Sequence, residues 1–493
     1  MAKMPFVDRR VELGALDRFY RRDSAGLLVL FGRRRVGKTE LLSHWLETRA
    51  IGDQQAIFWT ANTYNSASQL QSLTQELVWR DPTFARAAGA DFAFPDWAAA
   101  FNFIGDLAQK SPATLVVIID EFTNILRNDP DMTSVLQPLW DHRLSRIPQL
   151  RLVLTGSMVS LIKRELLAAN APLYGRATAL MHLRPLPYGT MREIYPTWPG
   201  DARLAAYAVC GGVPAYLGLL REGECFETGL TEHALTAGSI MMTDPQLILN
   251  EQLRDTNHYA SVLGAIASGF HDWGTIAKMT GLEKTGLSSY IDTLESLELV
   301  EQRKPILAAQ SDRKARYYVA DNFMRFYYRF AVPHTTAIMR GRLGLMRESL
   351  HEQLRAFIGL YVFEEVCRDW VAQQADLGKL GFRPDAGQIG AYWQSTREAR
   401  VALDVAVANA SEQRLFLGEC KWGEGEVSRR VLTDLIERSR RMPQLADPES
   451  GWRADYALFA REGFTVATRD AARELGVRLV MLDEIEDALA AEV

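Results

Sequence analysis

Short apolar runs alternate with amphipathic segments over the first 200 residues of the chain. The apolar runs have the length of single strands and cover residues 27–31, 56–60, 115–120 and 150–155. Apolar strands separated by helices are typical of a parallel sheet whose two faces are both covered. The pattern therefore predicts an α/β domain over residues 1–200, which ends in the proline-rich stretch between Pro185 and Pro199.

The hydrophobic pattern changes three times after this domain. Residues 201–257 have a helical pattern and predict a helical lid. In residues 258–335, helices at 276–280 and 287–297 are joined by a turn at Gly281. Two strand-like segments, 300–307 and 315–319, follow them, an order that predicts a winged helix-turn-helix.

Residues 336–493 return to alternating helices and strands and predict a second α/β domain. Helices are expected at 350–371 and 427–440, and strands near 389–393, 400–408, 414–420, 454–460 and 477–482. The predicted fold class is therefore α/β and multidomain: a parallel sheet with a helical lid, a winged helix, and a C-terminal α/β domain.

Composition excludes several classes of protein. A hydrophobic content of 47% with 24% charged residues is ordinary for a globular chain, which excludes a disordered or collagen-like protein. The four cysteines have no CxxC spacing, which argues against a disulfide framework and a zinc ribbon. We find no apolar run long enough to cross a bilayer. We therefore expect a soluble cytoplasmic protein without a membrane partner.

Any excess of positive charge must be local, because 61 acidic residues outnumber 56 basic residues over the whole chain. One basic patch lies in and beside the predicted wing: Arg303, Lys304, Arg313, Lys314 and Arg316. A second patch, residues 322–347, contains five arginines and no acidic residue. These patches predict DNA as a partner, bound through backbone phosphates rather than base edges, since the predicted recognition helix also carries Asp292 and Glu295. The alternative is that the module packs against the rest of the chain.

The segment Gly32 to Thr39 has the spacing GxxxxGK[ST] and lies directly between an apolar strand and a helical segment. Glycines allow backbone N–H groups to surround phosphates, and the helix N-terminus adds its dipole. Lys38 would then contact the β and γ phosphates, and Thr39 would bind Mg²⁺. The sequence thus predicts a site for ATP and Mg²⁺. The residues expected to bind the nucleotide here are Gly32, Arg35, Val36, Gly37, Lys38, Thr39 and Glu40, although the loop arginines could instead pair with acids across the domain.

A second motif completes this site at residues 115–121, where an apolar strand ends in Asp120 and Glu121. Ligands bind at the carboxyl edge of open α/β sheets, which is where these two carboxylates would lie. Asp120 is expected to hold Mg²⁺, and Glu121 to orient or deprotonate the attacking water. A strand that merely meets solvent is the alternative.

The chain resembles the archaeal-type ATPases, a branch of the AAA+/STAND P-loop class that also occurs in bacteria. The motifs that carry the resemblance lie at residues 6–13, 32–39, 118–122, 154–157, 172–176 and 211–214. The resemblance implies that Phe6 and Arg9 lie beside the adenine and that Ser157 or Thr155 senses the γ phosphate. It also implies that Arg176 is an arginine finger or sensor, which requires a homo-oligomer if it acts in trans. Alternatively, Ser157 is structural and Arg176 pairs with a helix carboxylate.

A second set of charged residues lies in the C-terminal domain. Strand-like segments 401–408 and 415–421 are joined by a hairpin-like loop, and Glu419 and Lys421 share one face of their strand. Asp404 can lie opposite them. Two carboxylates and an ammonium suit a Mg²⁺-dependent phosphodiesterase, in which the carboxylates hold the metal and the lysine positions water or offsets charge.

This order of residues resembles the restriction-endonuclease-like fold, with an acid followed by (D/E)xK after a hairpin. The resemblance adds Glu364 as an acidic residue from the preceding helix, while Leu403 replaces the proline common before the acid. The predicted catalytic residues are Lys38, Glu121, Arg176, Asp404, Glu419 and Lys421, and the predicted metal ligands are Thr39, Asp120, Glu364, Asp404 and Glu419.

The sequence predicts an ATP-binding and ATP-hydrolysing protein coupled to a DNA-binding winged helix and a Mg²⁺-dependent nuclease domain. The alternative is a nucleotide-switch signalling or scaffold protein whose nuclease-fold domain is inactive, because charged pairs at a sheet edge have the same sequence pattern.

Overall fold

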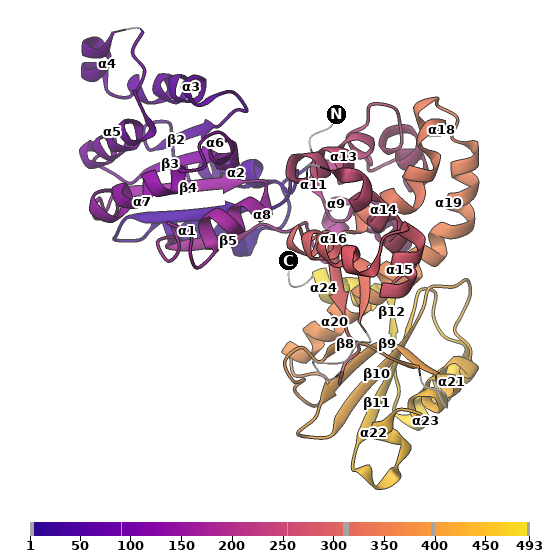
Figure 1. The fold of residues 1–493 in the computed structure, drawn as a ribbon. Helices are drawn as coiled ribbons and strands as arrows, with labels where there is room; N and C mark the ends of the chain where they lie inside the picture. Colours follow the sequence, from indigo (N-terminus) through magenta and orange to yellow (C-terminus); the bar gives the residue numbers. More distant parts are fainter. Residues whose placement is uncertain (1–3, 90, 254, 309–314, 396–399, 491–493) are drawn as a thin grey trace. The chain divides into compact units, whose positions relative to one another are not determined.

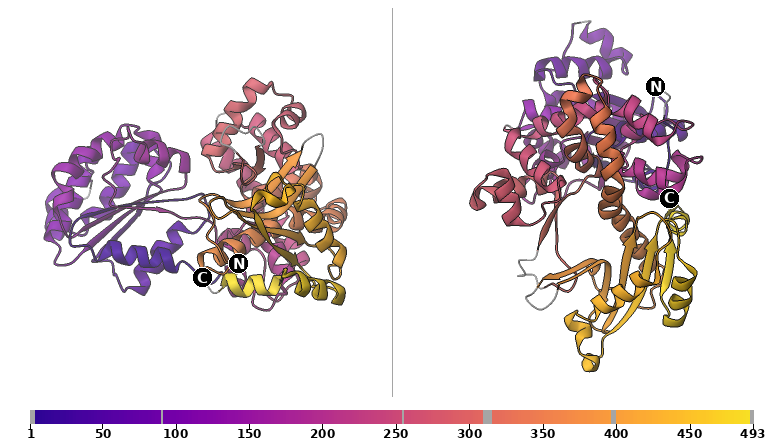
Figure 2. Two further views of the ribbon diagram at one scale, coloured as in Figure 1. Left: turned by 90° about the horizontal axis from the view of Figure 1, so that it is seen from below. Right: turned by 90° about the vertical axis from the view of Figure 1, so that its right-hand side faces the viewer.

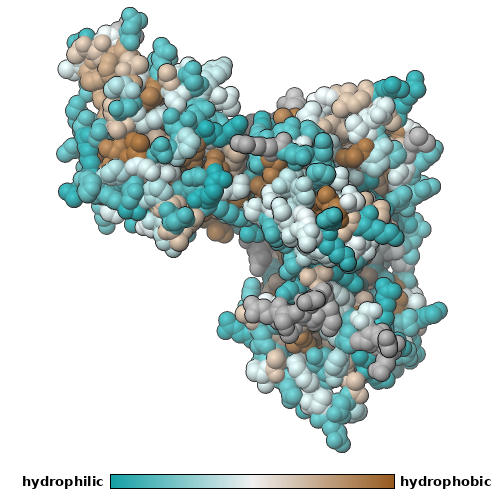
Figure 3. All heavy atoms as spheres, in the orientation of Figure 1, coloured by the Kyte–Doolittle hydropathy of each residue, from teal (hydrophilic) through white to brown (hydrophobic). Residues whose placement is uncertain are grey.

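The computed structural model describes residues 4–89, 91–253, 255–308, 315–395 and 400–490. The chain folds into two compact units, one formed by Asp8–Pro185 and the other by Met1–Val7 together with Leu186–Val493 (Figure 1). Hydrophilic side chains cover most of the face of each unit that Figure 3 shows, and apolar residues gather there only in small patches. Among the residues described, no helix combines the length and apolar character needed to cross a membrane.

The unit Asp8–Pro185 is built on a parallel five-stranded sheet in the order β2-β3-β4-β1-β5, as predicted. Its strands are β1 (Gly26–Phe31), β2 (Ala56–Thr60), β3 (Leu115–Asp120), β4 (Leu150–Gly156) and β5 (Ala179–His182). Every residue of β1, β3 and β4 is buried, which explains why these segments are apolar without alternation.

Helices connect these strands and cover the sheet. They are α1 (Arg10–Tyr20), α2 (Lys38–Thr48), α3 (Ser66–Val78), α4 (Pro82–Ala88), α5 (Trp97–Lys110), α6 (Phe122–Asn128), α7 (Met132–His142) and α8 (Val159–Ile162). Asn65, Asp81 and Asp96 accept hydrogen bonds from backbone N–H groups at the starts of α3, α4 and α5. These side chains mark where each helix begins.

The second unit begins at Leu186, closer to the N-terminus than the predicted boundary at residue 200. The reason is packing: the backbone N–H of Leu186 donates to Gly212 O at 2.8 Å, and Tyr188 and Met191 are buried in the core of the second unit. The helices that follow are α9 (Met191–Ile194), α10 (Gly200–Cys210), α11 (Pro214–Leu217), α12 (Phe226–Thr228) and α13 (Ile240–Gln252).

Three helices and a two-stranded antiparallel sheet come next along the chain. They are α14 (Thr256–Ala267), α15 (Trp273–Thr280), α16 (Lys284–Ser296), β6 (Val300–Arg303) and β7 (Arg316–Val319). Helix α15 ends at Gly281, whose φ of +70° explains the glycine. The predicted strand 300–307 ends earlier, at Arg303, and Arg313 and Lys314 lie outside the described residues. Two short helices, α17 (Asn322–Phe326) and α18 (Thr335–Met339), follow.

One long helical stretch leads from this region into a mixed sheet (Figure 2). It comprises α19 (Gly344–Phe357), a π-helical segment (Ile358–Phe363) and α20 (Glu364–Asp376). The sheet has the order β12-β11-β10-β9-β8, in which β8, β9 and β10 are antiparallel neighbours and β10, β11 and β12 are parallel neighbours. The strands are β8 (Ile389–Ser395), β9 (Arg400–Asn409), β10 (Arg414–Lys421), β11 (Arg453–Ala460) and β12 (Arg478–Met481).

The two faces of the mixed sheet belong to different cores. Val405, Phe416 and Phe459 pack into a core that extends through the long helical stretch and the helices after Leu186. Leu403, Leu417 and Leu458 pack into a separate core on the opposite face, with α21 (Arg429–Ser439) and α23 (Val466–Leu475). Helices α22 (Pro443–Ala446) and α24 (Leu482–Ala490) complete the chain. The shared core joins the predicted segments 201–257, 258–335 and 336–493 into one unit.

His271, between α14 and α15, is held among aromatic side chains. Its Nδ1 lies 2.9 Å from Tyr317 O, and since a carbonyl can only accept, this nitrogen carries the proton. Its Nε2 lies 3.2 Å from Tyr361 Oη and accepts from that hydroxyl. Burial, with the nearby charges of Arg325, Arg316 and Arg303, lowers the pKa of His271 to about 4. The neutral imidazole is therefore the native form.

We predict that His271 makes folding sensitive to acid. Between pH 6.5 and 4 the unfolded chain binds a proton at His271 that the folded chain does not bind, so the free energy of unfolding falls as the pH falls through this window. From pH 7 to pH 5 this one group should contribute a loss of about 2 kcal/mol. Chemical denaturation at both pH values should show a smaller pH-dependent loss for His271→Gln than for the unaltered chain. The same pH dependence in both would refute the assignment.

Candidate functional site

The loop between β1 and α2 has two glycines for different physical reasons. A Cβ at Gly32 would lie 2.2 Å from Leu183 O, so no side chain fits there. Gly37 has φ +96° and directly precedes α2. Arg35 also has a positive φ, +68°, a conformation that costs energy in a non-glycine residue and is often found where the backbone is shaped for a ligand. Val36 is fully buried and anchors the loop, while Glu40 is exposed in the first turn of α2.

Lys38 is the first residue of α2 and its side chain is only 5% exposed. The ammonium donates to Gly32 O at 2.9 Å and to Arg33 O at 3.3 Å, and lies 4.0 Å from Glu121 Oε1. The lysine thus bends back over its own loop, where its positive charge lies beside the backbone that would surround phosphates.

The Asp120 carboxylate joins the start of α2 to the ends of β3 and β4. Thr39 Oγ1, at the start of α2, donates to Asp120 Oδ2 at 2.8 Å. Thr155 Oγ1, near the end of β4, donates to the other oxygen, Oδ1. Asp120 is 3% exposed. The structure therefore brings the predicted metal ligands Thr39 and Asp120 into direct contact.

Glu121 is held in one orientation by β4 and the loop after it. The backbone N–H and the hydroxyl of Ser157 donate to Glu121 Oε2 at 3.1 and 2.8 Å, and the N–H of Glu121 donates to Thr155 Oγ1 at 3.1 Å. Glu121 has φ +52°, a second strained backbone position in this site. The sequence offered Thr155 and Ser157 as alternative sensors of the γ phosphate. In the structure Thr155 contacts the Asp120 carboxylate, and Ser157 contacts the Glu121 carboxylate.

Arg9 lies behind the loop rather than being free in solvent. Its guanidinium donates to Val36 O at 3.2 Å, to Arg184 O at 2.8 Å and to Glu12 Oε1 at 3.0 Å, and the residue is 5% exposed. Arg9 therefore supports the loop backbone directly. Phe6 belongs to the other unit, so its position beside an adenine stays a prediction.

Arg176 is paired within its own chain. Its Nε and Nη2 donate to the Asp141 carboxylate of α7 at 2.8 Å, and its Nη1 donates to Pro172 O at 2.7 Å. The structure thus has the helix-carboxylate pair that the sequence left open as the alternative to an arginine finger. To reach a γ phosphate, Arg176 would first have to leave Asp141.

A parallel sheet with Lys38, Thr39 and Asp120 brought together at its carboxyl edge defines a P-loop nucleotide-binding domain. In agreement, residues 6–220 match the family described as an ATPase domain predominantly from Archaea. Residues 327–432 match a family of archaeal and bacterial proteins of unknown function.

Individual relatives agree with this class. An uncharacterized protein of Methanocaldococcus jannaschii is 27% identical over 437 residues, 88% of this chain and 92% of that protein. An uncharacterized ATP-binding protein of the same organism is 48% identical over 46 residues, 9% of this chain and 78% of that protein. The Walker-type ATPase of Pyrococcus abyssi shares the fold with a TM-score of 0.50 and 19% identity, over 66% of this chain and 96% of that one.

The matched ATPase domain over residues 6–220 thus agrees with the P-loop domain that the geometry defines.

The predicted carboxylates of the mixed sheet also converge. In the β9–β10 ladder Gly418 pairs with Val405, which makes Asp404 and Glu419 neighbours at its end. The N–H of Cys420 donates to Asp404 Oδ2 at 2.9 Å, and Lys421 Nζ donates to Glu419 Oε1 at 2.7 Å. Burial, together with the charge of Glu419, raises the pKa of Asp404 to about 6.

Glu364, at the start of α20, approaches Asp404 but not as part of an assembled metal site. Burial and the charge of Asp404 raise the pKa of Glu364 well above its ordinary value. Arg368, which the sequence analysis did not single out, lies 3.5 Å from Glu364 Oε2 and donates to Asp404 O at 2.8 Å. In the described part of the chain no group of three or more His, Cys, Asp or Glu side chains is placed to hold a metal. The expected trio of Glu364, Asp404 and Glu419 is therefore not assembled as a metal group, and Arg368, Lys421 and Arg438 contact its members instead.

Three arginines of the basic patches are engaged within the chain. Arg303 of β6 and Arg325 of α17 both pair with Glu365 Oε1, at 2.5 and 3.1 Å, and Arg325 is 1% exposed. The guanidinium of Arg316 lies 4.7 Å above the ring of Trp393 in β8. These side chains hold the two-stranded sheet against the C-terminal part, as in the packing alternative, whereas Lys304 is exposed.

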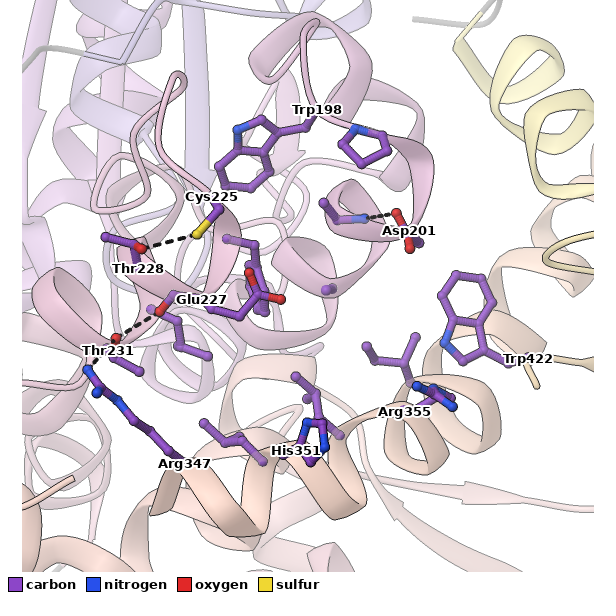
Figure 4. Close-up of a pocket in the computed structure, with 18 of the residues that line it drawn as sticks. Trp198, Asp201, Cys225, Glu227, Thr228, Thr231, Arg347, His351, Arg355 and Trp422 are labelled. Atoms are coloured by element: carbon purple, nitrogen blue, oxygen red, sulfur yellow. Dashed lines mark hydrogen bonds between the residues drawn. The ribbon is translucent and has the colours of Figure 1, made fainter. Parts of the chain in front are cut away.

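A cavity of about 850 Å³ lies between α10, α12 and α19 (Figure 4). Arg347, His351 and Arg355 lie along the α19 wall at four-residue spacing, and Trp198 and Trp422 line other parts of it. Arg347 donates to Thr231 Oγ1 across the cavity at 3.3 Å. No sequence motif marks this cavity, because it is formed by side chains from distant segments.

We predict opposite roles for two adjacent glutamates. Burial alone would raise the pKa of Glu365, but Arg325 and Arg303 more than offset this and lower it, so the carboxylate is charged. Glu365→Gln removes the carboxylate that pairs with the buried Arg325 and leaves Arg303 with Glu301 as an acidic partner, so the free energy of unfolding should fall by about 3 kcal/mol. Urea denaturation measures this loss.

The matched control is Glu364→Gln, one position earlier on the same helix. Because its environment favours the neutral form, a neutral amide of the same shape should change stability by less than about 0.5 kcal/mol, or increase it. Equal losses in the two variants would contradict the prediction.

Proposed function

We propose that the chain hydrolyses ATP at the carboxyl edge of its parallel sheet, with Lys38, Thr39, Asp120 and Glu121 as the residues that act. The observation that carries the proposal is the hydrogen-bonded network that joins Thr39, Asp120, Thr155, Glu121 and Ser157 beside the buried Lys38. All five of these residues have polar side chains, and they converge from the start of α2 and from the ends of β3 and β4, which a purely structural sheet edge does not require.

The donors fit Mg²⁺, because a threonine hydroxyl and a carboxylate oxygen 2.8 Å apart are hard oxygen ligands. Thr39 and Asp120 would hold the ion, which supplies neutralisation of phosphate charge when bound. Lys38 would exchange its hydrogen bonds to Gly32 O and Arg33 O for the β and γ phosphates. Glu121, oriented by Ser157, would accept a proton from the attacking water.

This proposal predicts different defects for two variants. Lys38→Ala removes a ground-state contact with phosphate and should abolish both binding and turnover of ATP. Glu121→Gln keeps the shape of the site but cannot accept a proton, so it should bind ATP with nearly unchanged affinity and lose turnover by on the order of 100-fold or more. Equilibrium binding of a fluorescent ATP analogue and phosphate release measure the two properties. Similar losses of affinity in both variants would refute the division of roles.

We assign the segment from α14 to β7 to a winged helix that contacts DNA. The order of three helices and an antiparallel strand pair supports this assignment. Because Arg303 and Arg325 are engaged with Glu365, phosphate contacts would come from other exposed cations such as Lys284.

We assign α20 to β12 to a restriction-endonuclease-like domain with Mg²⁺-dependent nuclease activity. The order of elements supports this assignment, because the antiparallel strands β8, β9 and β10 are followed by helix α21 and the parallel strand β11. Asp404, Glu419 and Lys421 also lie next to one another. One observation favours the alternative, a nucleotide switch with an inactive domain: Glu419 lies between two cations, Lys421 and Arg438 of α21.

Cleavage assays separate these two functions. If the domain is a nuclease, Mn²⁺ or Mg²⁺ should support cleavage of DNA, and Asp404→Asn should abolish it while ATP turnover stays unchanged, since the two sites lie in different units. Single-stranded, duplex and branched DNA are the substrates to compare. If the unaltered chain cleaves none of them, the inactive-domain alternative holds.

A further inference from the structure

Helix α21 brings a second set of charged side chains to the carboxylates of the mixed sheet. A cavity of about 300 Å³ lies where the end of β10 faces this helix. The charged residues that line it are Glu419, Lys421, Asp434, Glu437, Arg438 and Arg441. The residue pattern that predicted the carboxylate site includes none of the four residues from the helical side.

The two carboxylate oxygens of Glu419 face different cations. Oε1 accepts a hydrogen bond from Lys421 Nζ, its neighbour on the strand, at 2.7 Å. Oε2 lies 2.7 Å from Arg438 Nη2 but, within the described residues, it accepts no hydrogen bond. Glu419 is 5% exposed, so this oxygen is a buried acceptor that is compensated by charge alone. A buried carboxylate oxygen without a hydrogen bond normally has a further partner, such as an ion.

Arg438 is held at this position by contacts that do not involve Glu419. Its Nη1 donates to Ala402 O at 3.0 Å, and its Nε donates to Asp434 O at 3.2 Å. The side chain is 29% exposed, so it can turn toward solvent without disturbing the core. Arg441 lines the same cavity and is exposed. A variant of Arg441 is therefore a suitable control for a variant of Arg438.

We propose that Arg438 is a resident counter-ion that occupies the place of a divalent cation at Glu419 Oε2. The inference rests on the proposed metal-dependent function of the same site. Two cations cannot share one carboxylate oxygen at these distances without repulsion, so a divalent cation binds only when Arg438 turns away. Arg438 therefore lowers the affinity of the carboxylates for the metal and stabilises the domain when no metal is bound.

The test is the affinity of the nucleotide-free full chain for Mn²⁺, measured by isothermal titration calorimetry. Asp404→Asn identifies the heat that belongs to this site, because Mn²⁺ bound elsewhere is unaffected by it. Arg438→Gln should bind Mn²⁺ roughly tenfold more tightly than the unaltered chain, since one partly buried ion pair no longer has to be broken. Arg441→Gln should leave the affinity unchanged, and Arg438→Lys, which retains a cation, should give a smaller gain than Arg438→Gln.

Thermal unfolding with and without Mn²⁺ gives a second measurement. The rise in melting temperature on adding Mn²⁺ distinguishes the proposed role of Arg438 from a merely structural one. In EDTA, Arg438→Gln should melt at a lower temperature than the unaltered chain, because the Glu419 charge loses a partner. Saturating Mn²⁺ should then raise its melting temperature by more than it raises that of the unaltered chain.

The possible outcomes distinguish a failure of the proposed role of Arg438 from a failure of the proposed metal site. Unchanged Mn²⁺ affinity in Arg438→Gln and Arg438→Lys, with binding still lost in Asp404→Asn, would overturn the role of Arg438 and leave the metal site in place. If neither the unaltered chain nor the Arg438 variants shows Mn²⁺ binding that depends on Asp404, the proposed metal-dependent function itself fails.

Discussion

The buried carboxylate of Asp120 is the interaction on which the nucleotide site depends. It accepts hydrogen bonds from Thr39 and Thr155, so one carboxylate links the loop after β1, the end of β3 and the end of β4. A carboxylate buried to 3% exposure is stable only with such partners. The hydroxyls of Thr39 and Thr155 that donate hydrogen bonds to Asp120 thus also set the spacing between the loop after β1 and Glu121.

The second unit depends on a comparable constraint at Glu365. Arg303 of β6 and Arg325 of α17 pair with this glutamate at the start of α20. The preceding residue, Glu364, lies near Asp404. Adjacent residues of one helix thus contact β6 and α17 on one side and the carboxylate cluster on the other. The shared hydrophobic core adds to this connection, so the region that we assign to DNA and the region that we assign to nuclease chemistry belong to one compact unit.

The sequence predicted those features that local patterns determine. The apolar segments 27–31 and 115–120 are strands of the parallel sheet, and the loop between Gly32 and Thr39 joins a strand to a helix as its spacing required. The neighbouring positions of Asp404 and Glu419 followed from a hairpin, in which register is fixed by a short loop.

Long-range charge pairs could not be predicted in this way. Arg303, Arg176 and Arg438 had many acidic residues as equally suitable partners, and only the packed structure selects Glu365, Asp141 and Glu419. For the same reason the basic patch near the wing suggested a free surface for phosphates, although Arg303 is engaged with Glu365. The compact unit that contains Leu186 begins within the proline-rich stretch, because prolines mark irregular backbone but not which core that backbone joins.

The most direct test of the central claim is an experimental structure of the full chain with Mg²⁺ and a non-hydrolysable ATP analogue. The account predicts that the ammonium of Lys38 has left Gly32 O and contacts the β and γ phosphates, with Mg²⁺ held by Thr39 and Asp120 and Glu121 still bonded to Ser157. A nucleotide bound elsewhere, with Lys38 still donating to Gly32 O, would contradict it.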